Sequence, residues 1–422
     1  MQPPDPSELT SPIAFEGVPR PADDDGREER ENLDVLQLAL RRQWDLGRNV
    51  LLLWRPTEQG VDLLCVPHYS IGGFVASRRI VPAPYARRVG DRALGGVSSG
   101  RFLAEMVKGS RCVTHDFMQF AARLLETTPV LIPVPHPGAL TGAVLTAIDD
   151  LVLRHSIGYV EDRAVFLIDI SRFSLFEPVA QMTQLNSLAY SLNSAQARLA
   201  RTRMHVDFAR SSTGDGFYVW NRDAGADANL NLYHLMQFTL ADNGLAHARS
   251  TAAGTVPTLK SAFHIGGGYE FRQYEALQPT EYSYVVGDVT IELARIVEQA
   301  QPGQILVGDF RTRVPDQHGR EFPGREVDAR GFIARLQDSL ADLRGLRLAG
   351  GEIDSIRCYL TGPRERADRW GVTRLQAIDK HGLSRDVFNA KMNIHRIQSP
   401  PIFLGLQDDE LVDTDRVRRV SS

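Results

Sequence analysis

The stretch 164–176, AVFLIDISRFSLF, decides the fold of the second half of the chain. Its opening residues are apolar except for Asp169, which predicts a buried strand with a carboxylate near its end. The stretch 210–220, RSSTGDGFYVW, places Asp215 in a tight turn before another strand. Between them, the apolar spacing of 178–199 predicts a long helix. A helix and a strand can return the chain so that adjacent strands present both carboxylates next to each other.

Two carboxylates that converge on one point repel each other unless a cation lies between them. Hard cations such as Mg²⁺ are held by one or two carboxylates together with substrate phosphates. The pair therefore predicts a phosphoryl-transfer site with two ions per site, Mg²⁺ or Mn²⁺. Taken singly, an aspartate at a strand end or before glycine is more commonly a turn residue, so this hypothesis depends on the pair in its context.

Strand and helix patterns alternate through the rest of the second half. This alternation predicts a mixed sheet with helices packed on it, and therefore the α+β class. The predicted strands cover 204–209, 217–220, 259–265, 304–307 and 356–360, and the predicted helices cover 230–240 and 288–300.

Short motifs follow one another in this half in a recognisable order. They are F-x-x-D-I-x-x-F-S at 166–174, G-D at 214–215, F-H-x-G at 263–266, V-x-G-D at 285–288 with A-R on the next helix, and P-G-Q-I-L-V at 302–307. This order resembles the class III nucleotidyl cyclases, the catalytic domains of adenylyl and guanylyl cyclases. The resemblance implies a ferredoxin-like mixed sheet with flanking helices. It also implies an enzyme that converts a nucleoside triphosphate to a 3′,5′-cyclic nucleotide and pyrophosphate.

The resemblance implies roles for individual residues. Asp169 and Asp215 match the metal-binding aspartates, and the backbone carbonyl of Ile170 matches a further metal ligand. Members of this family are dimers whose active sites lie between two subunits, so a homodimer is implied. Backbone amides of the loop after the first strand would cradle phosphates, and this loop comprises Ser171, Arg172, Phe173 and Ser174.

The transition-state arginine of the family matches Arg295, whose guanidinium would bridge phosphate oxygens as they gain charge. The alternative is a solvated helix face on which Arg295 pairs with Glu292 and Glu298. Ile291 stands where the family has a transition-state asparagine, and it cannot hydrogen-bond to the ribose. The triphosphate-binding lysine of the family falls near Ala349, although other basic residues could substitute for it, namely Arg347 and Lys380.

The positions that read the base also depart from the family pattern. Ser211 and Tyr284 stand where the family has Lys and Asp for adenine, or Glu and Cys for guanine. A catalytically inactive regulator would lose these residues, but it would usually lose the metal aspartates too. A bulky tyrosine opposite a small hydroxyl suits a pyrimidine better. This pattern resembles the pyrimidine cyclases of bacterial antiphage signalling, which make cyclic UMP or cyclic CMP. An adenylate or guanylate cyclase in ligand-regulated signalling is the alternative.

The apolar pattern in the first half of the chain predicts a smaller α+β unit. An apolar repeat opens a helix at Leu33, and strand-like runs follow at 50–54 and 62–66. The runs PVLIPVP (129–135) and GALTGAVLT (138–146) match the two strand motifs of a GAF domain, the small-molecule-sensing module. The resemblance implies a sensor with an unknown small-molecule or protein trigger.

Four segments are therefore predicted along the chain. They are a disordered, proline-broken tail at 1–32, a GAF-like sensor at 33–158, the cyclase domain at 159–362 and a C-terminal extension at 363–422. In the extension, LQAIDKHG and FNAKMNIHR are expected to pair as two strands.

Composition excludes several classes of protein. The 48 basic and 52 acidic residues give a net charge of −4, so neither nucleic acid nor an anionic membrane is an expected partner. The three cysteines show no C-x-x-C spacing, which argues against a disulfide framework or a cysteine zinc site. The start of the chain lacks the pattern of a signal peptide, and no run approaches 18 apolar residues. A cytoplasmic protein is expected.

Overall fold

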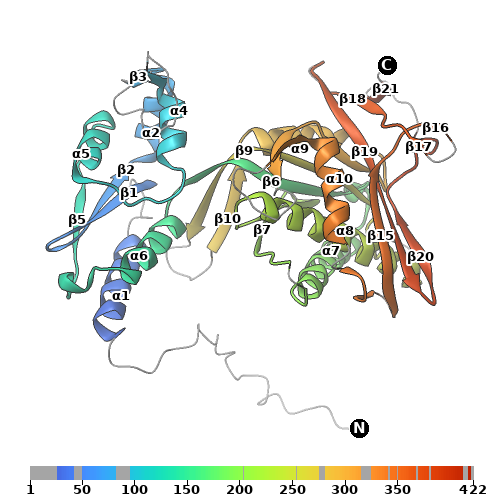
Figure 1. The fold of residues 1–422 in the computed structure, drawn as a ribbon, viewed down its shortest axis with the longest axis horizontal. Helices are drawn as coiled ribbons and strands as arrows, with labels where there is room; N and C mark the ends of the chain where they lie inside the picture. Colours follow the sequence, from blue (N-terminus) through green and yellow to red (C-terminus); the bar gives the residue numbers. More distant parts are fainter. Residues whose placement is uncertain are drawn as a thin grey trace, which may run out of the picture. The chain divides into compact units, whose positions relative to one another are not determined.

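The strand that carries Asp169 lies within a mixed sheet of twelve strands, counted over the described part of a computed structural model (Figure 1). Both faces of this strand are buried, with Phe166 and Ile168 on one face and Val165 and Leu167 on the other. The predicted α+β class with a mixed sheet is confirmed. The structure describes residues 26–41, 50–81, 96–202, 204–252, 254–274, 281–314, 325–340, 343–348, 350–366, 369–379, 382–411 and 417–419.

The main path of the large sheet contains eight strands. In spatial order they are β14 (Arg347–Leu348), β15 (Gly351–Leu360), β19 (Ser384–Ile397), β11 (Ile305–Gly308), β9 (Leu259–Tyr274), β6 (Gly158–Ile170), β8 (Gly216–Asn221) and β7 (Phe208–Ser212). Only β9 and β11 pair in parallel along this path. Further strands pair beside it, namely β10 (Glu281–Val286) with β9, β18 (Arg374–Ile378) and β20 (Ser399–Leu404) with β19, and β21 (Val417–Arg419) with β18.

Helices cover both faces of this sheet (Figure 1). On the face of Phe166, the core includes side chains of α7 (Pro178–Leu199), α8 (Ala226–Arg249) and α10 (Ala329–Leu340). On the face of Leu167, the apolar stripe of α9 (Asp288–Gln299) covers the strands. The predicted long helix at 178–199 and the helix after V-x-G-D are confirmed. The smaller elements of this region are η6 (Phe173–Leu175) and two strand pairs, β12 (Arg311–Val314) with β13 (Arg325–Asp328) and β16 (Arg364–Arg366) with β17 (Arg369–Trp370).

The chain divides into two compact units. The first comprises Met1–Pro67 and Arg111–Val152, and the second comprises His68–Ser110 and Leu153–Ser422. The first unit holds a three-stranded antiparallel sheet of β1 (Val50–Thr57), β2 (Gly60–Val66) and β5 (Val130–Pro133), with α1 (Arg27–Arg41), α5 (His115–Leu124), η5 (Pro137–Ala139) and α6 (Ala143–Arg154). The second unit also takes α2 (His68–Ala76), β3 (Ile80–Val81), β4 (Val97–Ser98) and α4 (Ser99–Met106).

Two predictions for the first unit were wrong. The run 138–146, predicted as a strand, forms η5 and the start of α6, because Val144, Ile148 and Val152 recur at helical spacing and are buried. The tail predicted at 1–32 ends earlier, because α1 begins at Arg27. Buried Asn32 on this helix exchanges hydrogen bonds with the backbone of His136 at 2.7 and 2.9 Å. Residues 1–25 lie outside the described part of the chain.

The late part of the chain also differs from expectation. The last strand of the second domain was expected near 356–360, but β19 lies between β15 and β11 inside the sheet. The two strands expected in 363–422 are present as β18 and β19, and both belong to this sheet. The strand predicted at 204–209 lies at Phe208–Ser212, closer to the turn that holds Asp215.

Gly216 offers a test of the fold. A Cβ at this position would overlap the carbonyl oxygen of Ile168 on β6, so Gly216→Ala forces the two strands apart. We expect a loss of about 1–3 kcal/mol in the free energy of unfolding, measured by urea denaturation. The matched control is Gly244→Ala in α8, where a Cβ would lie 3.4 Å from the side chain of Leu404. This substitution should leave the free energy of unfolding unchanged or raise it. An unchanged midpoint for Gly216→Ala would contradict the close pairing of β6 and β8.

Candidate functional site

The structure brings Asp169 and Asp215 together. Asp169 is the second-last residue of β6 and pairs with Gly216 at the start of β8. One residue on, the amide of Ile170 donates a hydrogen bond of 2.9 Å to the carbonyl oxygen of Asp215. The hydroxyl of Thr213 donates to the Asp215 carboxylate at 3.3 Å, across the turn. The two acidic side chains therefore emerge at the same end of two neighbouring strands.

Charge is unbalanced at this point of the sheet. Partial burial, and next to it the negative charge of Asp215, raise the pKa of Asp169 from 3.8 to about 6. Lys260, which pairs with Asp169 on β9, opposes this rise in pKa but does not cancel it. A divalent cation between the two carboxylates would relieve both their repulsion and the cost of their burial. The donor set thus fits a hard cation such as Mg²⁺ or Mn²⁺.

Lys260 is a candidate residue that the sequence analysis missed. It lies directly opposite Asp169 in the register of β9 and β6, so both side chains are on the same face of the sheet. The signal in the sequence is a lysine within the apolar run LKSAFHI, at a position where alternation gives no reason for a charge. An ammonium group beside a carboxylate pair can bind phosphate oxygens that reach the same point.

The loop after β6 has an unusual backbone. Arg172 adopts the left-handed conformation, with φ 59° and ψ 27°, which is uncommon for a residue other than glycine. A short 3₁₀ turn, η6, follows it directly, and left-handed and right-handed residues in succession form backbone concavities that bind anions. Ser171 is buried, and its hydroxyl has no hydrogen-bond partner among the described residues. This loop therefore holds strain and an unsatisfied polar group next to the carboxylate pair.

The two residues predicted to read the base lie on strands that contact each other, β7 and β10. Ser211 pairs with Tyr218 of β8, whose hydroxyl donates to the carbonyl oxygen of Thr290 in α9 at 3.2 Å. Tyr284 stacks on Phe271 of β9, with ring centroids 5.2 Å apart. The strands of the two residues are therefore neighbours, and each residue also has a partner of its own, Tyr218 for Ser211 and Phe271 for Tyr284.

Arg295 is held by acidic residues of its own chain. Its Nε lies 3.5 Å from Oδ2 of Asp379, and its Nη1 lies 4.0 Å from Oε1 of Glu292 on the same helix. Arg385 forms ion pairs with the same two acids. The i,i+3 pair with Glu292, expected as the alternative for this residue, is present. Neither aspartate of the carboxylate pair is among the ion-pair partners of Arg295 within the described residues.

The other predicted positions have mixed outcomes. Ile291 is 48% exposed on α9, where the family has an asparagine. Arg347 lies exposed on β14. Ala349 and Lys380 lie outside the described residues. Across the described ranges, three or more His, Cys, Asp or Glu side chains nowhere gather as a metal-binding group, so the carboxylate pair would need phosphate oxygens to complete a metal's coordination.

Within the described residues, every helix is too short or too polar to span a membrane.

Comparisons with known proteins give low similarity. No family model and no curated protein matches the chain. Adenylyl and guanylyl cyclases are among the solved structures that resemble it. The guanylyl cyclase domain of RhoGC from Blastocladiella emersonii is 16% identical over 36% of this chain and 80% of its own length, with a TM-score of 0.29. The guanylyl cyclase Cya2 is 10% identical over 55% of this chain and 92% of its own, with a TM-score of 0.32. The adenylyl cyclase CyaB from P. aeruginosa is 11% identical over 58% of this chain and 97% of its own, with a TM-score of 0.31.

The carboxyl group of Asp169 should titrate above its ordinary pKa. In EDTA we expect a pKa of about 6 for this group, followed by ¹³C NMR of its carboxyl carbon. Asp215→Asn should lower this pKa because it removes the neighbouring charge, and Lys260→Met should raise it because it removes the opposing cation. If the pKa of Asp169 is the same in both variants as in the wild-type protein, then Asp169 does not interact with Asp215 or Lys260.

The raised pKa of Asp169 also determines how the stability of the protein changes with pH. Because the pKa of Asp169 is raised in the folded state, the metal-free protein binds more protons when folded, and its stability should fall as the pH rises from about 4 to about 6. Asp169→Asn should flatten that part of the profile of melting temperature against pH.

Proposed function

We propose that this chain is a metal-dependent nucleotidyl cyclase, which forms a 3′,5′-cyclic nucleotide and pyrophosphate from a nucleoside triphosphate. The observation that carries the proposal is the placement of Asp169 at the end of β6 beside Asp215 in the turn before β8, with a raised pKa of Asp169 that a bound cation would lower. The strained loop and Lys260 beside this pair supply groups for phosphates. Carboxylates and phosphate-binding groups at one point are the combination that phosphoryl transfer requires.

Each residue of the site has a defined task in this proposal. Asp169 and Asp215 hold the Mg²⁺ or Mn²⁺ ions, with the carbonyl of Ile170 as a third ligand. When bound, the ions lower the pKa of the ribose 3′-hydroxyl and neutralise charge on the phosphates. Lys260 binds phosphate oxygens and orients them toward the attacking hydroxyl. The backbone amides of the loop cradle the same phosphates, and this loop comprises Ser171, Arg172, Phe173 and Ser174.

Arg295 is proposed to act on a second copy of the chain. Its side chain lies on α9 and is bound to Asp379 and Glu292 rather than to the carboxylate pair of its own chain. An arginine supplied by a partner subunit could bridge the phosphate oxygens when negative charge develops there. The functional unit is then a homodimer with its sites between the subunits.

The proposed substrate is a pyrimidine nucleotide, UTP or CTP. The support is the pair Ser211 and Tyr284, which offers hydroxyl groups and one bulky ring in place of the charged residues that read purines. A product of this kind would act as a second messenger in antiphage defence. We also propose that the first unit is the sensor of an unidentified trigger and that the protein acts in the cytoplasm.

The activity is tested with purified protein, Mn²⁺, and ATP, GTP, CTP and UTP in separate reactions, with products identified by mass spectrometry. We expect cyclic UMP or cyclic CMP. Asp169→Asn and Asp215→Asn should each lower the rate by at least roughly a hundredfold, because each removes a metal ligand that stabilises the transition state by several kcal/mol. The matched control, Asp227→Asn, changes an exposed aspartate in the first turn of α8 and should keep its activity.

The outcomes of that panel separate the alternatives. If the product is cyclic AMP or cyclic GMP, the proposed cyclase activity stands, but the roles given to Ser211 and Tyr284 are contradicted. If none of the four nucleotides gives a product, although the protein unfolds with a normal cooperative transition, the proposed enzymatic activity is contradicted. That result would favour a nucleotide-binding regulator.

Mixing two inactive variants tests the shared site. Asp215→Asn protein and Arg295→Ala protein should each be inactive alone. After subunit exchange, half of the dimers carry both changes in separate chains, and each of these has one intact site, so about a quarter of the wild-type rate should return. A mixture that stays inactive although light scattering shows dimers would place Arg295 outside the site of the partner.

A further inference from the structure

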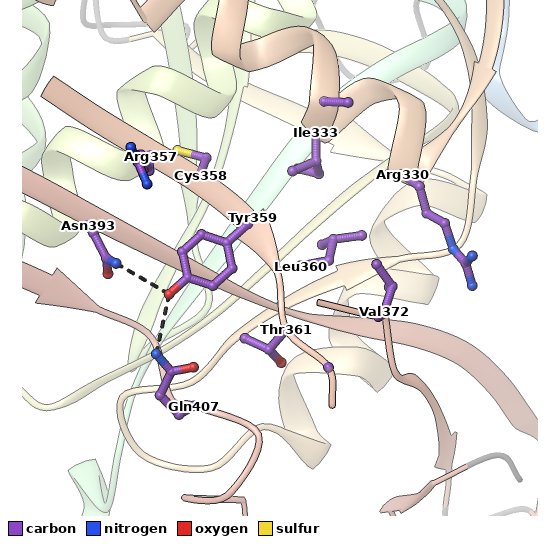
Figure 2. Close-up of a pocket in the computed structure, with 13 residues that line it drawn as sticks. Arg330, Ile333, Arg357, Cys358, Tyr359, Leu360, Thr361, Val372, Asn393 and Gln407 are labelled. Carbon is purple, nitrogen blue, oxygen red and sulfur yellow. Dashed lines mark hydrogen bonds between the residues drawn. The ribbon is translucent and has the colours of Figure 1, made fainter. Parts of the chain in front are cut away.

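A cavity lies in another part of the large sheet, far along the sequence from the carboxylate pair. It has a volume of about 550 Å³, within the range of small-molecule sites. It opens where α10, the end of β15 and the turn after it meet β19 and the segment that follows β20 (Figure 2). The residues that matter for its chemistry are Arg330, Arg357, Tyr359, Thr361, Asn393 and Gln407.

The walls of this cavity are fixed by a buried polar network. Asn389, which is fully buried, donates to the hydroxyl of Thr361 and to the carbonyl of Leu406, both at 2.8 Å. The amide of Thr361 returns a hydrogen bond of 2.8 Å to the carbonyl of Asn389. At Gly362, a Cβ would overlap the carbonyl oxygen of Gly371, so two backbone segments meet there without side chains. A cavity whose walls are held in this way loses little entropy when a ligand enters.

The charge of the lining is entirely positive. Its residues in the described part of the chain include Arg330 and Arg357 and no aspartate or glutamate. Neither guanidinium forms an ion pair with a described carboxylate, and Arg330 packs over the ring of Phe388 with its Cζ 5.3 Å from the centroid. Figure 2 shows these two arginines on opposite sides of the cavity. Next to this lining, the carboxylate of Asp408 accepts a hydrogen bond of 3.5 Å from the hydroxyl of Thr361. An anion would therefore find two guanidinium groups without a carboxylate partner among the described residues.

Neutral hydrogen-bonding groups gather around Tyr359. Its hydroxyl accepts hydrogen bonds from the amides of Asn393 and Gln407, each at 3.3 Å, so its own proton is left to donate to a ligand. The side-chain oxygen of Asn393 is buried and has no partner among the described residues. Figure 2 shows this group on the side of the cavity away from Arg330. Donors and acceptors of this kind read the polar edge of a heterocycle, and the apolar lining between them is Ile333, Leu360 and Val372.

We propose that this cavity binds a nucleoside monophosphate, or another heterocycle of that size with one phosphate, at a site separate from the carboxylate pair. Arg330 binds the phosphate, and Tyr359, Asn393 and Gln407 bind the edge of the base. Arg357 adds positive charge at the base end. The proposal does not rest on the cyclase activity, because no residue of the cavity belongs to the site of Asp169 and Asp215.

The test is calorimetric titration of the full chain, in the Asp215→Asn background and in EDTA, with AMP, CMP, GMP and UMP. At least one of them should bind with one site per chain. Arg330→Gln should weaken that nucleotide by about tenfold or more, because it removes a charge-assisted hydrogen bond, but should leave the affinity for the matching nucleoside unchanged. Tyr359→Phe should weaken both ligands. Arg325→Gln, an exposed arginine of β13 outside the lining, is the matched control.

Three results would overturn the proposal. One is that none of the four monophosphates binds at about 1 mM, the weak limit of specific affinity. Another is binding that Arg330→Gln and Tyr359→Phe leave unchanged. The last is binding that requires Mn²⁺ and is lost in Asp215→Asn, which would assign the nucleotide to the carboxylate pair and leave the proposed cyclase intact.

Discussion

The close approach of β8 to β6 at Gly216 is the constraint on which the candidate site depends. A side chain there would overlap the Ile168 carbonyl, so glycine alone permits the register in which Asp169 pairs with Gly216 and the amide of Ile170 bonds to Asp215. That register sets two carboxylates at neighbouring strand ends, where burial and their mutual repulsion raise the pKa of Asp169. The fold thus accepts an electrostatic cost at one point, and a cation with a polyphosphate is the kind of ligand that removes it.

The two candidate sites on the large sheet differ in charge. The end of β6 and β8 presents carboxylates, with Lys260 as the neighbouring cation, and it suits a metal ion with phosphates. The end of β15 presents two arginines without a carboxylate partner among the described residues, together with neutral amides around a preformed cavity, and it suits an organic anion without metal. Because this cavity is lined by β15, β19 and the segment after β20, the late part of the chain contributes a cavity of its own as well as strands to the sheet.

Strong local patterns made most of the second unit predictable. The buried strand with Asp169, the helix at 178–199 and the turn with Asp215 each follow from periodicity and turn chemistry, and adjacency of the two aspartates follows from their order. Long-range pairing could not be predicted in the same way. Nothing local reveals that β19 inserts between β15 and β11, nor that Asp379 reaches Arg295. Lys260 was missed because its position opposite Asp169 depends on strand register, which the local sequence does not reveal. The run at 138–146 was misassigned because a short apolar stretch is compatible with both strand and helix.

We propose above all that Asp169 and Asp215 together hold a divalent cation with a nucleotide. Crystals of the full chain grown with Mn²⁺ and a non-hydrolysable UTP analogue would test it most directly, by anomalous scattering at the manganese absorption edge. We expect manganese peaks between the two carboxylates, with the triphosphate along the loop after β6. Nucleotide bound elsewhere in the chain, with no manganese at the pair, would contradict it.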